Sequence, residues 1–450
     1  MANSSPYHVR AVHCDYRSSD DEVYAALQRV TAPLEKAWLR LKAARRIACK
    51  FSHGRAAERQ VRYEGHLQEL TSEQIMRATI RLLRENTNAE IVVGETSIFR
   101  VPEEDHDPAW AAPLKKLLRE LDVPFVNGDL PPHRVYAVPG GGQMFRQYTL
   151  PQNLAEADAL VVVQKLKNHV FMGVTLTLKD LFGLTPQEPY GRARQYFHHF
   201  VRLPYILADL GRIWQPALNI VDGMIGQARS EWGGEARVCN TLVAGDHPVA
   251  TDACAAHLMG CDPAGDWPSP PYVRDRNALL VAAEGGFGTV NLAEIDFQSE
   301  VQAPVGEFGV QQTDPPELVA AWRRSTCEQA LYYRDHRQHF VERYAGEYIL
   351  LQDHEVCWHD TQSDLQRSRR DLAGAHKESA MWFKLVDPDE AEGEHYEVYE
   401  RVLAQLQVSS ASHTDAQAAE CNPIPVTGCT IAPLPQPSQT ASSPGRPGRK

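Results

Sequence analysis

The sequence has few basic residues for its length and no long apolar run. Its 450 residues include 46 Lys and Arg against 58 Asp and Glu, which gives a formal net charge of −12. Because nucleic-acid binding depends on clustered cations, this balance argues against a DNA- or RNA-binding protein. No stretch approaches the roughly 18 apolar residues of a membrane span, and the start of the sequence lacks the apolar segment of a secretory signal. We therefore expect a cytoplasmic protein without a membrane partner.

The spacing of the cysteines argues against a disulfide-bonded protein and against a complete zinc or iron site. The nine cysteines are odd in number and scattered, which fits reduced thiols better than a disulfide framework. Cys254, His257 and Cys261 have a spacing that could suit zinc or iron, but a fourth ligand is not evident, and buried cysteine is commonly a small core residue. The glycine clusters at 139–145 and 283–291 lack the order of a dinucleotide-binding loop, and no serine-hydrolase motif occurs. We expect these cysteines to be buried and the glycines to form turns.

Short apolar runs alternate with helical patterns from residue 46 to residue 300. Runs that are apolar almost throughout suit strands buried on both faces, as in a parallel sheet covered by helices. The sequence therefore predicts an α/β fold: a doubly wound, mostly parallel sheet with helices on both faces. The runs lie at 89–95, 123–129, 159–164, 217–223 and 241–246.

The regions on either side of this core have other patterns. Residues 1–45 predict an N-terminal helical segment, because apolar residues recur there at three- and four-residue spacing. Residues 301–408 combine charged helical patterns with an alternating stretch, which predicts a small C-terminal α+β region. Residues 409–450 are rich in serine, alanine and threonine and contain seven prolines, so we expect a disordered tail.

The most informative stretch follows the run at 159–164. Lys165, Lys167 and His169 alternate there, and Thr175 and Lys179 are four residues apart in a helical pattern that follows. In open α/β sheets, ligands bind outside the carboxyl ends of the strands, so these side chains could form one basic pocket. They predict a site for a small anion such as a carboxylate or a phosphate. The alternative is that the lysines are solvated and the threonines reflect β-propensity.

Carboxylates also follow two of the predicted strands. Asp222 ends the run at 217–223, and Asp246 ends the run at 241–246, with Asp252 close behind. Such carboxylates could hold a divalent cation or act as acid and base. The alternatives are a turn for Asp222, a helix N-cap for Asp246 and a macrodipole contact for Asp252.

A histidine pair is a further candidate. His198 and His199 stand beside Arg192 and Arg194. An imidazole there could titrate near neutral pH. A packing or surface role is the alternative.

In their order, these motifs resemble the family known as domain of unknown function 362. The resemblance covers about residues 46–300 and rests on QKLKNH, TLTLKDLFG, IVDG, AGDHPVATD and LMGCDP. It implies one α/β domain in which the lysines, His169 and the aspartates share a site. Asp180 replaces the asparagine usual in the family, and Phe51 and Ser52 follow Lys50 in place of Pro-Asn. Many relatives have ferredoxin-like cysteine clusters that this chain lacks, so we expect no iron–sulfur cluster.

Together these features predict an enzyme that acts on a small anionic metabolite by isomerase, lyase or group-transfer chemistry, without a redox cofactor. The alternatives are a non-catalytic accessory protein that binds a metal or cofactor, with the C-terminal region as a docking element for a protein partner, or a scaffold with solvated lysines. The residues expected to bind substrate are Lys165, Lys167, Thr175 and His199. Those expected to take part in catalysis are His169, Lys167 and Lys179. The candidate ligands of a divalent metal are Asp222, Asp246 and Asp252.

Overall fold

The computed structural model describes residues 5–97, 109–191, 194–311, 314–363 and 379–407, together with the single residues 365 and 372. The tail expected over 409–450 lies outside these residues, and so does Arg192. The described residues up to Leu406 belong to one compact unit. Among the described residues, no helix has both the length and the apolar character needed to cross a bilayer.

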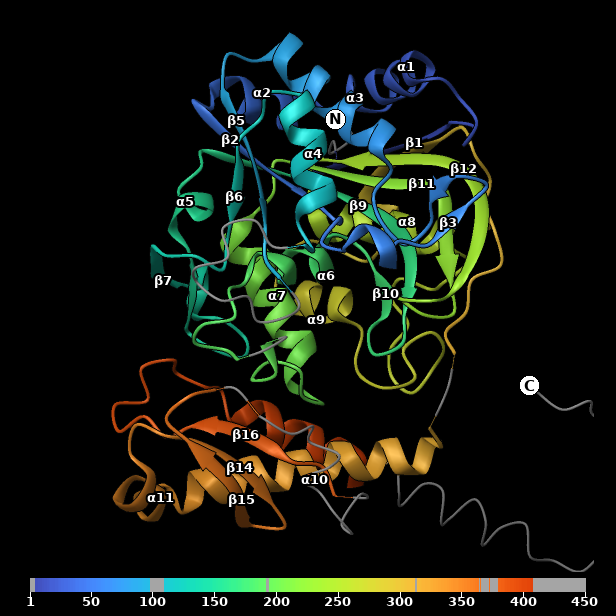
Figure 1. The fold of residues 1–450 in the computed structure, drawn as a ribbon. Helices are drawn as coiled ribbons and strands as arrows, with labels where there is room; N and C mark the ends of the chain where they lie inside the picture. The colour runs from blue at the N-terminus through green and yellow to red at the C-terminus, as the bar shows by residue number, and fades with distance from the viewer. Residues whose placement is uncertain are drawn as a thin grey trace, which may run out of the picture. The chain divides into compact units, whose positions relative to one another are not determined.

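A large mixed sheet forms the centre of the fold (Figure 1). Its strands are β1 (Tyr7–His13), β2 (Arg46–Phe51), β5 (Glu90–Glu95), β6 (Phe125–Asn127), β9 (Ala159–His169), β10 (Gly173–Thr175), β11 (Leu218–Ala228), β12 (Glu235–Gly245) and β13 (Ile295–Ser299). Their order is β13-β1-β12-β11-β9-β2-β5-β6, and β10 pairs with β9. Strands β11, β9, β2, β5 and β6 are parallel to one another, whereas β12 is antiparallel to β11. The predicted mostly parallel sheet is confirmed.

Helices cover both faces of this sheet because its central strands are apolar on both sides. In β2, Ile47, Cys49 and Phe51 pack into one hydrophobic cluster, and Ala48 packs into another. The first cluster includes side chains of α1 (Asp20–Thr31), α2 (Glu35–Ala43), α3 (Glu73–Asn86) and α4 (Ala112–Glu120). The second includes side chains of α5 (Gln152–Ala155), α6 (Thr177–Leu181), α7 (Arg202–Trp214) and α9 (Ala278–Glu284), and α8 (Pro248–Leu258) packs mainly in a third. This confirms helices on both faces.

Several elements differ from the sequence-based expectation. The run at 217–223 continues to Ala228 in β11, and the run at 241–246 belongs to β12, which begins at Glu235. The strand expected over 159–164 continues to His169, because β10 pairs antiparallel with its last residues. The residues before 46 form α1 and α2 and also β1, which pairs with β12 and β13. Lys165, Lys167 and His169 therefore lie within a buried strand.

Shorter elements complete the core. Two hairpins join β3 (Arg62–Tyr63) to β4 (His66–Leu67) and β7 (His133–Ala137) to β8 (Gln147–Pro151). Short 3₁₀ helices are formed by Ala57–Arg59, Pro139–Gly141, Phe182–Leu184 (η3) and Leu292–Glu294. The glycines at 140–142 all have positive φ, so this cluster forms a turn, as expected.

The C-terminal region is a small α+β structure. Helices α10 (Pro316–Asp335) and α11 (Arg337–Tyr344) precede a sheet of β14 (Tyr348–Gln352), β15 (Glu355–Asp360) and β16 (Trp382–Leu385), in the order β15-β14-β16. Residues 397–407 are helical. This region contacts α7 through a fully buried ion pair, in which Arg202 Nη2 lies 2.7 Å from Glu394 Oε1.

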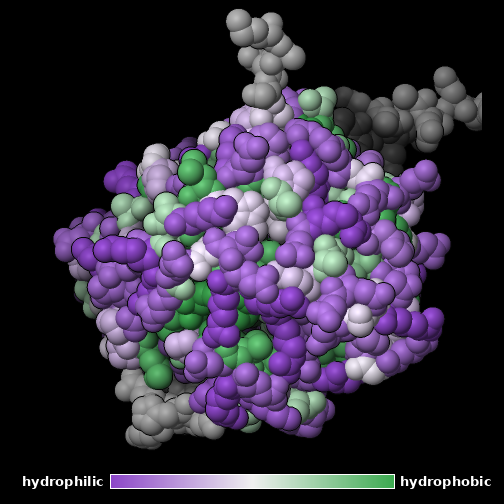
Figure 2. Space-filling view, turned by 90° about the horizontal axis from the view of Figure 1, so that it is seen from above, coloured by the Kyte–Doolittle hydropathy of each residue, from purple (hydrophilic) through white to green (hydrophobic). Residues whose placement is uncertain are grey.

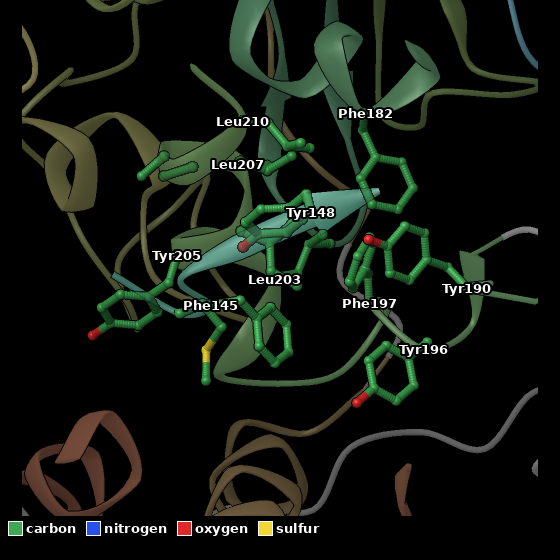
Figure 3. Packing of buried hydrophobic residues seen from close by; sticks show 14 of the residues in the cluster. Phe145, Tyr148, Phe182, Tyr190, Tyr196, Phe197, Leu203, Tyr205, Leu207 and Leu210 are labelled. Atoms are coloured by element: carbon green, nitrogen blue, oxygen red, sulfur yellow. The ribbon is translucent and has the colours of Figure 1, made fainter. Parts of the chain in front are cut away.

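Aromatic side chains fill the core beside α7 (Figure 3). The rings of Tyr190 and Phe197 have centroids 4.0 Å apart, and Phe182 packs edge-on against Phe197 at 6.3 Å. Phe182 belongs to η3, which follows α6 directly. The cluster therefore fixes the end of α6 against the core. Seen from above, the surface is mostly hydrophilic, and apolar side chains form smaller patches (Figure 2).

Candidate functional site

The order of the strands in the sheet changes direction between β2 and β9. The chain proceeds outward from β2 to β5 and β6, then returns so that β9 lies on the other side of β2, followed by β11. In doubly wound sheets, ligands bind at such a switch point, outside the carboxyl ends of the strands. A cavity of about 330 Å³ lies there, lined by Lys50 at the end of β2 and by Lys167 and His169 at the end of β9. Its volume is in the range of small-molecule sites.

Four of the predicted site residues line this cavity: Lys167, His169, Thr175 and Lys179. Lys167 and His169 are two residues apart in β9, so their side chains leave the strand on the same side. Thr175 is the register partner of Lys167 in the β9–β10 hairpin. Lys179 lies on α6, which follows β10 after a single residue. One continuous segment therefore supplies all four.

Lys165 does not line the cavity, although it alternates with Lys167. Register in the sheet places Asp222 of β11 opposite Lys165 of β9. The Lys165 Nζ atom lies 3.0 Å from Asp222 Oδ2, and the two side chains are 1% and 0% exposed. Because its charge is neutralised inside the sheet, Lys165 has a structural contact where substrate binding was expected.

The three aspartates that were expected near a metal do not converge. Asp222 accepts the Ser72 backbone N–H at 2.8 Å, in addition to its contact with Lys165. Asp246 accepts the His8 backbone N–H and lies 2.9 Å from His8 Nδ1. Asp246 is also not the N-cap of α8, which is His247.

Asp252 has a third, separate set of contacts. It accepts the backbone N–H groups of Thr177 and Leu178, at 2.8 and 2.9 Å, and so holds the first residues of α6. Burial raises the pKa of Asp252 to about 7. Each carboxylate is engaged by a different part of the backbone, and no group of three His, Cys, Asp or Glu among the described residues is placed to hold a metal ion.

The remaining candidates also have packing contacts. His199 is buried, and its ring centroid lies 6.4 Å from that of Phe383, whereas its neighbour His198 lines the cavity. Cys254 and Cys261 are buried free thiols, which confirms the expected core position. Burial raises the pKa of Cys261 to about 11, so this thiol stays protonated at neutral pH.

His169 is held in one tautomer by the backbone. Its Nδ1 atom accepts the N–H groups of Phe171 and Met172 at 3.1 and 3.3 Å. The proton of the neutral ring is therefore on Nε2. Burial lowers the pKa of His169 to about 3, although the Glu231 carboxylate, 3.8 Å from Nδ1, opposes this effect. The arrangement favours a neutral hydrogen-bond donor over the proton-transfer role expected from sequence.

Among the described residues, no carboxylate forms an ion pair with Lys167 or Lys179. The Lys167 Nζ atom donates to the Glu69 backbone carbonyl at 2.9 Å and lies 4.8 Å from the centre of the Trp232 ring. The Lys179 Nζ atom lies 4.8 Å from the centre of the Phe182 ring. Burial lowers the pKa of each lysine to about 8. Both ammonium groups are thus poorly compensated by the described side chains.

Lys50 differs, because two carboxylates surround it. Its Nζ atom lies 2.8 Å from Glu95 Oε2 and 3.2 Å from Asp180 Oδ1. Burial alone would lower its pKa, but Asp180 and Glu95 outweigh that effect and raise it. The absence of a side chain at Gly183 makes room for this triad, since a Cβ atom there would lie 2.9 Å from Lys50 Cε. Asp180, which departs from the family pattern, therefore fixes a cation at the cavity wall.

Sequence reasoning missed several lining residues. Glu95 ends the predicted run at 89–95, so the strand-end argument that singled out Lys167 could have found it. His53 is 2% exposed, and neither of its ring nitrogens has a hydrogen-bond partner among the described residues. Arg194 has φ of 52° and donates from Nε to the Thr185 carbonyl at 2.7 Å. No local signal predicts that contact, because it depends on the tertiary fold.

Two comparisons with individual proteins give distant matches. The thylakoid-associated protein sll1697 of Synechocystis sp. is 25% identical over 154 residues, which are 33% of this chain and 45% of that protein. The aligned part thus spans less than half of that relative. The lactate racemase apoprotein from Thermoanaerobacterium thermosaccharolyticum has a TM-score of 0.33 at 14% identity, with 56% of each chain covered.

A family comparison covers the segment that carries the site. The match extends over residues 63–257, and it includes β9, β10 and α6, the elements that supply Lys167, His169, Thr175 and Lys179. It lies within the core of about residues 46–300 for which the resemblance was expected. The family model that matches these residues is described as Domain of unknown function (DUF362), so the central part of this chain is similar to that family.

Proposed function

We propose that the cavity binds a small metabolite that carries a carboxylate or a phosphate, and that the protein is an enzyme acting on it. One observation carries this proposal: Lys167 and Lys179 both line the cavity, and neither forms an ion pair within the described residues. By contrast, the buried ammonium groups of Lys50 and Lys165 have carboxylates within 3.2 Å. An anionic ligand would supply the missing counter-charge for the two unpaired lysines.

The residues around the cavity suggest separate roles. Lys167 uses one proton to bind the Glu69 carbonyl, which leaves two N–H donors for an anion. His169 offers its Nε2–H as an uncharged donor to a developing negative charge. Lys179 adds a second cation. These groups suit an isomerase, a lyase or a group-transfer enzyme, in which charge develops next to the anionic group.

Metal assistance would need a different ligand set from the one expected. Asp222, Asp246 and Asp252 are each engaged by backbone N–H groups at separate places. These carboxylates belong to the framework around the cavity. The proposed reaction therefore relies on lysine and histidine donors.

Isothermal titration calorimetry with acetate, phosphate and sulfate tests the proposal. We expect Lys167→Met to weaken binding of the preferred anion at least tenfold. Lys42, an exposed residue of α2, provides the matched control, and Lys42→Met should leave the affinity unchanged. Equal affinities for wild type and Lys167→Met would refute the anion site. A protein that purifies with bound metal and binds no anion would favour the accessory role.

A further inference from the structure

Lys179 differs from the other cationic side chains around the cavity. Within the described residues, Lys50 is paired with carboxylates, Lys167 donates to a carbonyl, and Arg194 donates to the Thr185 carbonyl. Lys179 has no such polar contact there, and its Nζ atom lies 4.8 Å from the centre of the Phe182 ring. The residue is half-buried, whereas Lys50 and Lys167 are each 2% exposed. Lys179 is therefore the lysine of the cavity whose amine has no polar partner among the described residues.

The backbone of Lys179 is held in place by the contacts of α6. It lies in the middle of α6, whose first two backbone N–H groups donate to Asp252. The following turn is anchored by the packing of Phe182 against Phe197. A reacting carbonyl group would thus meet an amine held on a rigid support, close to the anion-binding Lys167.

The electrostatic surroundings favour the neutral amine. Burial lowers the pKa of Lys179 to about 8, and the nearby cations Arg194 and Lys167 act in the same direction, while Glu231 and Asp180 oppose them. At pH 7, about one tenth of such an amine is unprotonated, against roughly one in 3,000 for an ordinary lysine. Desolvation and neighbouring cations are the usual means by which a lysine becomes a nucleophile.

We propose that Lys179 forms an imine with the carbonyl group of a small oxo acid. The inference rests on the proposed function, because the carboxylate of the oxo acid would bind at Lys167. Lys179 Nζ attacks the carbonyl carbon, a C–N bond forms and the C–O bond breaks. The oxygen leaves as water with two protons of the original ammonium group, so the product is a protonated imine with the same total charge. This cationic imine withdraws electrons from the adjacent carbon, as an isomerase or lyase requires.

Reductive trapping on the full-length protein tests this inference. The protein is incubated at pH 7 with pyruvate or acetoacetate, the smallest 2-oxo and 3-oxo acids of this type, and treated with sodium borohydride. Peptide mass spectrometry then locates the adduct. We expect modification of Lys179 at least tenfold above that of the exposed Lys42. Lys179→Arg, which keeps the charge, should abolish the adduct at this position without unfolding the protein, and Lys167→Met should reduce trapping at Lys179.

Calorimetry on the same variants separates this inference from the proposed function. If sulfate binds and Lys167→Met weakens its binding, but the adducts are spread over exposed lysines, the imine is refuted and the anion site stands. If no anion binds and Lys179 is not trapped, both proposals fail. Trapping at Lys179 that is independent of Lys167 would overturn the assigned carboxylate contact and therefore the oxo-acid class.

Discussion

Lys165 and Asp222 form a buried ion pair across neighbouring strands, with Nζ 3.0 Å from Oδ2. The same carboxylate oxygen accepts the backbone N–H of Ser72, the N-cap residue of α3. This single aspartate therefore joins β9, β11 and the start of a helix. A pair of residues that the sequence places among substrate and metal ligands thus serves to align the elements beneath the cavity.

Removal of the Asp222 charge is expected to be strongly destabilising. Asp222→Asn leaves Lys165 buried without a counter-charge, which typically costs ~3–5 kcal/mol. The asparagine oxygen can still accept the Ser72 N–H, so the effect reports on the lost charge. The double variant Lys165→Met/Asp222→Asn should recover most of the free energy of unfolding, measured by guanidinium denaturation. If the free energy of unfolding of Asp222→Asn lay within about 1 kcal/mol of the wild-type value, the pairing would be contradicted.

Anion binding should weaken between pH 7 and pH 9. Burial lowers the pKa values of Lys167 and Lys179 to about 8, so both ammonium groups lose their protons as the pH rises through this value. The affinity should fall by at least about tenfold, whereas a site built on ordinary lysines would keep its charge through pH 9. Sulfate is the suitable probe for calorimetry, because its own charge is constant over this range. A pH-independent sulfate affinity would show that these lysines are not the ligands.

Much of the fold could be predicted because its strands are buried on both faces. The apolar runs at 89–95, 159–164 and 217–223 all correspond to strands, and their alternation with helices correctly indicates a parallel sheet. The length of β9 could not be predicted, since its last residues are polar and pair with β10. The strand β1 escaped notice because its pairing with β12 spans more than 200 residues of sequence.

The residues of the candidate site could be predicted only where one continuous segment of the sequence supplies them. Lys167, His169 and Lys179 follow each other through a hairpin and a short helix, so local spacing was enough to group them. The separation of Lys165 from this group depends on the register of β11, which places Asp222 beside it. Local sequence contains no information on that register. For the same reason, the sequence did not indicate the backbone partners of the aspartates. Asp246 directly follows β12 as expected, but Asp222 lies within β11 and not at its end.

A glycine substitution can test how tightly Lys50 is held. In Gly183→Ala the new Cβ atom would lie 2.9 Å from Lys50 Cε and 3.2 Å from Glu95 Oε1, so the buried ion pair must shift. Overpacking of this kind typically costs ~1–3 kcal/mol. Gly54 is the matched control on the same cavity, because the nearest atom to its added Cβ would be Glu95 Cδ at 3.5 Å, an ordinary contact. Thermal denaturation should show a clear loss for Gly183→Ala and little change for Gly54→Ala. Equal melting temperatures would refute this account of the triad.

The buried pair between Arg202 and Glu394 should make the C-terminal α+β region unfold together with the core. Arg202 Nη2 lies 2.7 Å from Glu394 Oε1, and Arg202 Nη1 donates to the Phe383 carbonyl of β16 at 2.9 Å. Glu394 also neutralises Lys384, at 3.0 Å, so Glu394→Gln leaves two buried cations with less counter-charge. We expect a loss of ~3–5 kcal/mol in the free energy of unfolding.

The pair between the exposed Glu397 and the half-buried His395, at 2.7 Å, provides the control for this prediction. Glu397→Gln should cost no more than ~1 kcal/mol, because surface ion pairs contribute little. Guanidinium denaturation gives the free energies, and hydrogen exchange at β16 shows whether this strand opens with the core. In wild type, the amide hydrogens of β16 should exchange only on global unfolding, because the Phe383 carbonyl of this strand accepts a hydrogen bond from the buried Arg202 of α7. Equal losses for the two glutamine variants, or fast exchange of β16 in wild type, would show that the C-terminal region is stabilised independently of Arg202.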